Sequence, residues 1–387
     1  MLTVLAVLAP GQGSQKPGFL NPWLALPGAE ARLRWWSALS GVDLLHLGTD
    51  ADEEEIKDTA KTQPLLVAAA LLAAEHLPMH DAAVVAGHSV GELAASALAG
   101  VLSPEAAVTL AGVRGREMAA ACALEPTGMA AVLGGDPGEV VAAIDAAGLH
   151  PANRNGAGQI VAAGSMEGLD KFAAEPPAKA KVIRLKVAGA FHTPFMAPAE
   201  AALGRIAAGI PTGTPDRILL SNLDGTAVDH GPTMVRRLVR QITAPVRWDL
   251  CMETFAALGV TAVVELTPAG TLAGLAKRAL KGIEIVQVNT PADLDKARAA
   301  IGRHGFAAKV PRSEASVAVA ATAGPFTPAD LIEGSHIEAG QVIGAVRGAT
   351  GSVDVTAPAA GTLVEWLART DEPVASGRPL ARIGGQA

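Results

Sequence analysis

The sequence has little cysteine and few aromatic residues. Its 387 residues include two cysteines, Cys122 and Cys251, no tyrosine, and only 3% aromatic residues in total. Two cysteines so far apart support neither a disulfide framework nor a cysteine-based metal site, so we interpret both as buried thiols. We also expect no metal and no cofactor.

Charge is also scarce, and no apolar run is long. Charged residues make up 18% of the chain and the formal net charge is -7, so the composition does not suggest a nucleic-acid surface or a polybasic membrane patch. The apolar run at residues 2–9 lacks a basic leader and is shorter than the roughly 20 residues of a membrane span. Glu75 interrupts the apolar run at 64–77. We predict a cytoplasmic protein of two or three domains, without nucleic-acid or membrane partners.

Glycine, by contrast, is abundant, and one glycine-flanked serine is central to the prediction. The valine-rich run at 84–86 reads as a buried strand, Gly87-His88-Ser89-Val90-Gly91 follows it, and a helical pattern begins at Glu92. A strand, a tight turn and a helix with serine at the turn form a nucleophile elbow. The alternative is that Ser89 is only a turn residue and helix N-cap.

Three further residues could act with this serine. His192 lies in a glycine-bearing segment after a predicted strand and C-terminal to Ser89, which suits a general base that folds back onto its nucleophile. Gln12 stands between two glycines, so its N–H could approach a ligand carbonyl, although an ordinary Pro-Gly turn is the alternative. Arg114 lies on a helix that Ser103 and Pro104 begin, and taken alone it could simply be solvated.

The pattern of elements predicts an α/β fold with a small ferredoxin-like subdomain. Gln63-Pro64-Leu65 marks the expected start of a helix. Residues 128–187 alternate between short strands and helices, as expected for a ferredoxin-like unit. The expected elements are at 129–133, 137–147, 159–163, 165–174 and 181–187. The polar segment 153–156 is interpreted as a turn at the cleft between the subdomains, a common place for ligands.

Five motifs together give the chain a specific family resemblance. They are Gly-Gln-Gly-Ser-Gln at 11–15, Gly-His-Ser-Val-Gly-Glu at 87–92, Arg114-Gly115, Gly-Ala-Phe-His-Thr at 189–193, and Gln241 ahead of Pro245-Val246-Arg247-Trp248. In this order and spacing they resemble the malonyl-CoA:acyl carrier protein transacylases, over roughly residues 1–300. The resemblance implies an α/β-hydrolase-like acyltransferase domain with a parallel sheet.

The resemblance also implies a mechanism. Ser89 would attack the thioester of malonyl-CoA while His192 takes its proton, and the phosphopantetheine thiol of holo acyl carrier protein would then accept the malonyl group. The main-chain carbonyl of Gln241 would orient His192 in place of a carboxylate. The backbone N–H groups of Gln12 and Val90 would hold the oxyanion.

Four side chains would bind the substrate in this family. Arg114 would pair with the free carboxylate of the malonyl group, which an acetyl group lacks. Phe191 would close the space beside the α-carbon and disfavour methylmalonyl groups, although it could also be a plain core aromatic residue. Asn155 and His88 are further expected substrate-binding residues.

The C-terminal part contains an internal repeat. Residues 333–343 parallel residues 370–380, and two strand-turn-strand copies predict a flattened β-barrel that resembles biotinyl/lipoyl carrier domains. Such domains are modified on a lysine in a hairpin, which corresponds here to residues 347–352. No lysine follows Lys309, so we predict an unmodified domain.

Together these patterns predict four regions in the chain. They are a large acyltransferase subdomain at 1–127 and 188–306, a small subdomain at 128–187, a linker at 307–319, and the barrel at 320–387.

Other functions remain open at this point. An esterase or thioesterase would share the elbow. It would also require an acidic residue on a strand end between the serine and the histidine, and an early His-Gly loop, and the sequence shows neither in place. The malonyl transferase of a malonate decarboxylase would use the same residues with another carrier protein. A non-catalytic carrier or assembly subunit would act through the C-terminal domain. The basic pairs at 236–237 and 277–278 are candidate docking points for an acidic carrier of fatty-acid or polyketide synthesis.

Overall fold

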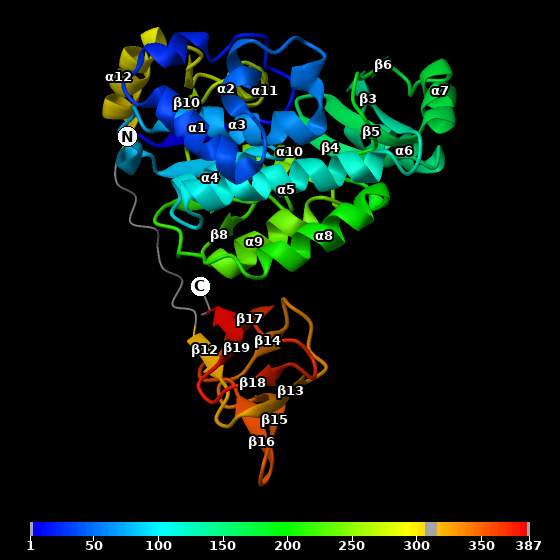
Figure 1. Cartoon of the computed structure of the whole chain (residues 1–387). Coiled ribbons are helices and arrows are strands. Elements are labelled where there is room, and N and C mark those ends of the chain that lie inside the picture. The colour runs from blue at the N-terminus through cyan, green and yellow to red at the C-terminus, as the bar shows by residue number, and fades with distance from the viewer. Residues whose placement is uncertain (1–2, 306–315, 385–387) are drawn as a thin grey trace. The chain divides into compact units, whose positions relative to one another are not determined.

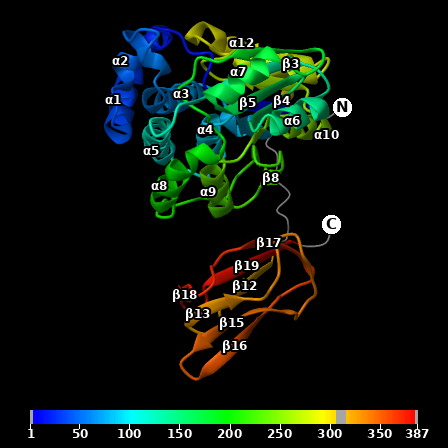
Figure 2. The same ribbon diagram turned by 90° about the vertical axis from the view of Figure 1, so that its right-hand side faces the viewer.

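The computed structural model describes residues 3–305 and 316–384. The chain divides into two compact units, residues 1–310 and residues 311–387, drawn in Figures 1 and 2. Each unit has its own hydrophobic core.

A mainly parallel sheet forms the centre of the first unit. Its strand order is β11 (Glu284–Gln287), β10 (Ala262–Glu265), β1 (Leu5–Ala9), β2 (Val84–Gly87), β7 (Ile218–Leu220) and β8 (Ala227–Val228). Neighbouring strands run parallel except β8, which is antiparallel to β7. Alternate residues of β1 enter two different apolar clusters, because both faces of the sheet are covered by helices.

Helices and short 3₁₀ turns surround this sheet. The helices are α1 (Ala29–Ser40), α2 (Leu44–Thr49), α3 (Thr59–Ala74), α4 (Gly91–Leu98), α5 (Pro104–Cys122), α8 (Ala197–Ala207), α9 (Gly231–Arg240), α10 (Trp248–Ala257), α11 (Thr271–Ala279) and α12 (Leu294–His304). The 3₁₀ turns are η1 (Asn21–Ala25), η2 (Glu55–Lys57), η3 (Met79–Asp81), η4 (Pro194–Met196) and η5 (Pro291–Asp293).

One predicted helix start is right and another is wrong. Ser103 caps α5 by accepting the N–H of Ala106, and Pro104 is its first residue, as predicted. Helix α3, however, begins at Thr59, where the Asp58 side chain accepts the N–H of Ala60, and Pro64 lies inside the helix. Proline removes one helical hydrogen bond, and this helix tolerates the loss because it is buried over nearly its whole length.

The small subdomain has the predicted ferredoxin-like topology. Its elements follow in the order β3 (Thr127–Gly134), α6 (Pro137–Ala146), β4 (His150–Gly156), β5 (Gln159–Ser165), α7 (Met166–Ala174) and β6 (Ala180–Arg184). The sheet order is β6-β3-β5-β4 with antiparallel neighbours, and β9 (Val246–Arg247) adds to it parallel to β4. Figure 1 shows this subdomain at the right end of the first unit.

The turn expected at residues 153–156 is wrong, because these residues belong to strand β4. The chain turns instead at Ala157 and Gly158, both with positive φ. Asparagine is uncommon in strands. Here the pairing of Asn153 with Val161 and of Arg154 with Ile160 overrides that local preference.

The second unit contains two four-stranded sheets around one apolar cluster. One has the order β12 (Ser316–Val319), β19 (Pro379–Gly384), β17 (Gly361–Trp366) and β14 (His336–Ile337). The other has the order β16 (Gly351–Thr356), β15 (Val342–Gly348), β13 (Gly324–Pro328) and β18 (Pro373–Val374). Figure 2 shows their strands stacked in a flattened arrangement.

Two sequence predictions concern the edges of this unit. Residues 316–319, which we expected in the linker, form strand β12 and pair with β19. The earlier part of that linker, residues 307–315, lies outside the described residues. The segment expected to carry a modified lysine joins β15 to β16, as a hairpin should. The likeness to biotinyl/lipoyl domains stays a prediction.

Within the described ranges, none of the helices combines the length and apolar character that a membrane crossing requires.

Candidate active site

Ser89 occupies a strained turn between β2 and α4. Its φ is 53°, a left-handed value that is uncommon outside glycine. A Cβ on Gly87 would lie 2.0 Å from the Gly91 carbonyl carbon, and one on Gly91 would lie 2.2 Å from the Ala9 oxygen. Both glycines are therefore needed for the bend. Asn222 holds the turn, because its Oδ1 accepts the Ser89 N–H at 2.8 Å and its Nδ2 donates to the Gly87 carbonyl at 2.8 Å.

Ser89, His192 and Gln241 form a line of hydrogen bonds. Ser89 Oγ lies 2.8 Å from His192 Nε2, and His192 Nδ1 lies 2.7 Å from the main-chain carbonyl of Gln241. Because a carbonyl oxygen only accepts, Nδ1 carries the proton and Nε2 is free to accept the serine proton.

The surroundings of His192 keep its imidazole neutral. The side chain is 4% exposed. Burial and the nearby charge of Arg114 lower the pKa of His192 to about 3, although the Gln241 carbonyl opposes the shift. Near neutral pH the ring is therefore in the form that a general base requires.

Arg114 brings a buried positive charge to the same serine. It lies on α5 and is 3% exposed. Its Nη1 donates to Gln63 Oε1 at 2.5 Å, and its Nη2 lies 3.0 Å from Gln241 Oε1 and 3.4 Å from Ser89 Oγ. Burial lowers the pKa of Arg114 to about 10, with Glu92 opposing the shift, so the guanidinium stays protonated. All three of these partners are neutral.

The loop that carries Gln12 lies beside the elbow. Strands β1 and β2 are parallel neighbours, with Ala9 opposite Gly87, so the loops after them meet at the same sheet edge. A Cβ on Gly11 would lie 2.7 Å from the His88 carbonyl oxygen, so the two loops are in contact. Val90 is the N-cap of α4. The backbones of Gln12 and Val90 therefore belong to adjoining loops.

The remaining predicted residues lie around the elbow. His88 Nε2 lies 2.9 Å from Asn155 Oδ1, which ties the elbow to strand β4 of the small subdomain. Burial lowers the pKa of His88. Phe191 is buried in the main apolar cluster directly before His192. This packing fits the core aromatic alternative, and its role beside the substrate stays a prediction.

Sequence reasoning missed three buried polar residues of this site. Glu92 is 0% exposed, its Oε1 accepts the Asn222 N–H at 2.6 Å, and its Oε2 accepts from Gln241 Nε2. Burial raises the pKa of Glu92, while the Asn222 N–H and the Arg114 charge oppose the rise. Glu92 ends a recognised motif and Asn222 follows strand β7, so both had a positional signal. Gln63 had none beyond its place before Pro64.

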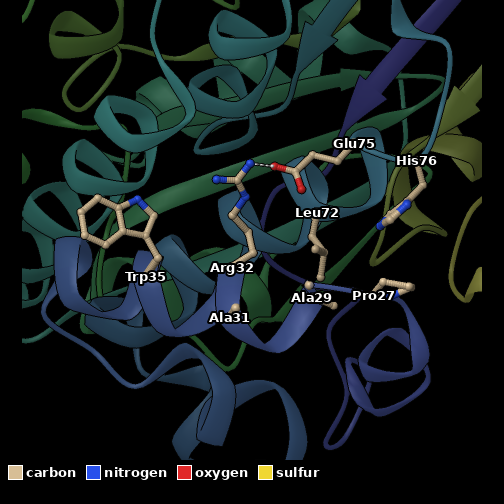
Figure 3. A pocket seen from close by; sticks show the side chains of 9 residues that line it. Pro27, Ala29, Ala31, Arg32, Trp35, Leu72, Glu75 and His76 are labelled. Atoms are coloured by element: carbon tan, nitrogen blue, oxygen red, sulfur yellow. Dashed lines mark ion pairs between the residues drawn. The ribbon is translucent and has the colours of Figure 1, made fainter.

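Another pocket of the first unit lies on helices α1 and α3. Arg32, Trp35, Leu72, Glu75 and His76 line it, and Arg32 pairs with Glu75 at 2.8 Å (Figure 3). None of the predicted site residues lines this pocket. In residues 3–305 and 316–384, no group of three or more His, Cys, Asp or Glu side chains is placed to hold a metal ion.

Comparisons with known proteins identify the family of the chain. Residues 8–318 match the family model described as "Acyl transferase domain". The malonyl CoA-acyl carrier protein transacylase of Mycobacterium tuberculosis H37Rv is 55% identical over 298 residues, which cover 76% of this chain and 99% of the relative. The protein of the same name from Escherichia coli K12 is 32% identical, over 75% of this chain and 97% of its own.

Solved structures give the same picture. The crystal structure of MCAT from Mycobacterium tuberculosis is similar with a TM-score of 0.74 at 54% identity, covering 76% of this chain and 99% of that one. A second similar structure is the complex of a malonyl-transacylase with a type II PKS acyl-carrier protein. It has a TM-score of 0.72 at 30% identity and covers 77% of this chain and 99% of that one.

Proposed function

The chain belongs to the acyl transferase family and, within it, to the malonyl CoA-acyl carrier protein transacylases, and we propose that it moves a malonyl group from malonyl-CoA to holo acyl carrier protein. One observation carries the proposal. The buried Arg114 guanidinium, whose hydrogen-bond partners are all neutral, lies 3.4 Å from Ser89 Oγ, and Ser89 Oγ is hydrogen-bonded to the neutral His192. We assign the reaction to the cytoplasm.

In the first half-reaction Ser89 Oγ attacks the thioester carbonyl carbon of malonyl-CoA. His192 Nε2 takes the hydroxyl proton, and the N–H groups of Gln12 and Val90 stabilise the oxyanion, each such donor contributing about 3 to 4 kcal/mol. The C–S bond then breaks, and His192 returns the proton to the departing CoA sulfur. The products are a malonyl-serine ester and CoA.

In the second half-reaction the phosphopantetheine thiol of the carrier attacks the ester. His192 takes the thiol proton and later gives it to Ser89 Oγ, which restores the enzyme. The Gln241 carbonyl keeps Nδ1 protonated throughout, so this dyad needs no carboxylate. This dyad distinguishes the proposal from an esterase with a serine-histidine-acid triad.

Arg114 selects acyl groups that carry a second carboxylate. In the malonyl ester the free carboxylate is two bonds beyond the carbonyl carbon attached to Ser89 Oγ, and Arg114 Nη2 is already close to that oxygen. A bidentate pair with the guanidinium would complete the recognition. An acetyl group would leave the buried charge without this partner.

The roles of the other predicted residues follow from their positions. Phe191 lies next to His192 and would crowd an α-methyl substituent. His88 and Asn155 join the elbow to the small subdomain and would contact the substrate beside Ser89. The subdomain limits predicted from the sequence, residues 1–127 with 188–306 and residues 128–187, are part of this proposal. The second unit has no step in the reaction.

The test is the intact mass of the full chain after brief exposure to malonyl-CoA, with acetyl-CoA and Ser89→Ala as controls. We expect one malonyl group on the wild-type chain, no group detected with acetyl-CoA in the same brief exposure, and none on the variant. Adding a holo carrier protein should then remove the group and place it on the carrier. Release of free malonate without a carrier would indicate a hydrolase, and loss of the group only to the carrier of a malonate decarboxylase would indicate that alternative.

A further inference from the structure

Glu92 is a buried carboxyl group that the reaction above does not use. It is the second residue of α4, three residues after Ser89, and it is fully buried. Both of its oxygens accept hydrogen bonds, Oε1 from the main chain of Asn222 and Oε2 from the side chain of Gln241. Because donors face both oxygens, these contacts favour the ionised carboxylate, which only accepts, and the Asn222 N–H and the Arg114 charge oppose the rise in the pKa of Glu92 that burial causes.

The side chain of Gln241 lies between Glu92 and Arg114. Its Nε2 faces Glu92 Oε2, Asn222 Oδ1 at 3.2 Å and the Ser89 carbonyl at 3.4 Å, all of which are acceptors. Its Oε1 is therefore turned toward Arg114 Nη2, at 3.0 Å. Gln241 thus connects a carboxylate to a guanidinium through a neutral amide.

We propose that Glu92 is a positioning residue that fixes the Gln241 amide, and through it holds the Arg114 guanidinium oriented and free for the carboxylate of the malonyl group. This inference rests on the proposed function. A carboxylate in direct contact with Arg114 would form an ion pair and compete with the substrate. The amide between them keeps Glu92 close enough to stabilise the buried positive charge while leaving the guanidinium available.

Glu92→Gln is the main test, because it keeps the shape and removes one acceptor. A glutamine has a single oxygen, so its NH₂ must face either the Asn222 N–H or the Gln241 NH₂, and either arrangement places two donors together. We expect the KM for malonyl-CoA in Ser89 acylation to rise about tenfold or more, with a smaller change in kcat. The low rate with acetyl-CoA should change by less than about threefold, because acetyl does not use Arg114.

A fall in the KM for malonyl-CoA in Glu92→Gln, instead of a rise, would overturn the inference. If Glu92 acts only through its negative charge, removing that charge should favour an anionic substrate, and the KM for malonyl-CoA should fall. An unchanged KM and an unchanged malonyl-to-acetyl ratio would likewise reject a positioning role. In each case wild-type malonylation of Ser89 would still stand, so failure of the inference is separate from failure of the proposed function.

A charge-matched exchange provides a second variant. The double substitution Glu92→Gln with Gln241→Glu keeps the net charge but moves the carboxylate into contact with Arg114. His192 keeps its acceptor, because that acceptor is the main-chain carbonyl of residue 241. We expect kcat/KM for malonyl-CoA to fall further in this double variant than in the single variant. Recovery of wild-type KM would mean that only the local charge matters, which rejects the proposal.

Glu265→Gln provides a control for losing a buried carboxylate. Glu265 is also fully buried, and it accepts the N–H groups of Gly270, Leu272 and Ala273 at the start of α11. We expect this variant, like Glu92→Gln, to lose stability but to keep the wild-type malonyl-to-acetyl ratio. If both variants change that ratio alike, the effect is general destabilisation and the positioning role is rejected.

Discussion

Arg114 in the first unit and Arg382 in the second unit are both buried, and the two have different partners. In the second unit Arg382 is 7% exposed and pairs with Glu365, which is 1% exposed, at 3.4 Å. In the first unit Arg114 is as deeply buried but donates to two amide oxygens and lies near a serine hydroxyl. A buried charge is costly unless it is paired.

On the proposed function, this difference separates a structural charge from one that binds the substrate. Arg382 has its countercharge, Glu365, inside the second unit, so its positive charge needs no ligand. Arg114 has its nearest countercharge, Glu92, one amide away, and the position in front of the guanidinium is next to the reactive serine. The first unit therefore carries the cost of a partly unpaired charge that a malonyl carboxylate would complete, whereas the second unit does not.

Removing the base should give the largest effect in this comparison. His192→Ala leaves Arg114 and its contacts in place but removes the acceptor of the Ser89 proton. We expect the rate of Ser89 malonylation to fall by about 10²- to 10⁴-fold. Rapid-quench measurement of the acyl-enzyme checks this. A fall of less than tenfold would mean that another group takes the proton.

Exchanging the two arginines for alanine, one at a time, tests the comparison directly. Arg114→Ala should lower kcat/KM for malonyl-CoA by about 100-fold, because the carboxylate loses its charged partner, and should leave acetyl-CoA nearly unchanged. Arg382→Ala should destabilise the second unit by about 3 to 5 kcal/mol, because it leaves Glu365 buried without this partner.

The readouts are acylation kinetics and denaturant unfolding. Malonyl-CoA kinetics should be unaffected by Arg382→Ala. If Arg382→Ala also lowers malonyl transfer, or if Arg114→Ala does not, the assignment of one arginine to structure and the other to recognition is wrong.

The parts of this site that the sequence could predict are those with a local signal. Ser89 and Arg114 lie in short motifs, and the spacing of apolar residues predicts the strands and helices that carry them. The hydrogen bonds between them depend on tertiary contacts, such as Asn222 reaching Ser89 across 133 positions. Glu92 and Gln63 could not be assigned a role because their partners are distant in sequence.

Errors in the predicted fold have the same origin. Proline inside α3 and asparagines inside β4 contradict local preference, and burial or strand pairing determines the outcome instead. The low charge of residues 316–319 and the lack of a distinctive apolar period favour a linker, but these residues form strand β12 because they pair with β19. Local signals therefore located most elements but could not report these pairings.

Measuring the free energy of unfolding over a range of pH tests how far the site lowers the pKa of His192. The pKa of His192 is lowered to about 3 in the native site, whereas an unfolded histidine titrates near about 6.5. Between these values the unfolded chain binds a proton that the native chain does not. The free energy of unfolding therefore falls as pH drops below about 6.5, by up to about 1.4 kcal/mol per pH unit from this group.

His192→Gln removes this contribution while keeping a polar side chain. As the pH is lowered from 7 to 5, we expect the free energy of unfolding to fall more for the wild type than for the variant. Unfolding of the first unit followed by chemical denaturation at each pH measures it. A constant difference would show that the histidine has an ordinary pKa in the native protein.

The smallest effect is expected from removing the second unit altogether. A chain of residues 1–310 retains the apolar clusters of the first unit and every residue assigned to the reaction. The Mycobacterium tuberculosis relative is matched over 99% of its length by 76% of this chain, so a full-length relative has no counterpart of the second unit. Malonyl transfer by the shortened chain should stay within about twofold of the full chain, as expected for independent domains. Ser89→Ala in the shortened chain is the background control. A loss of tenfold or more would mean that the second unit takes part in binding the substrate or the carrier, and Arg382→Ala should then reproduce part of that loss.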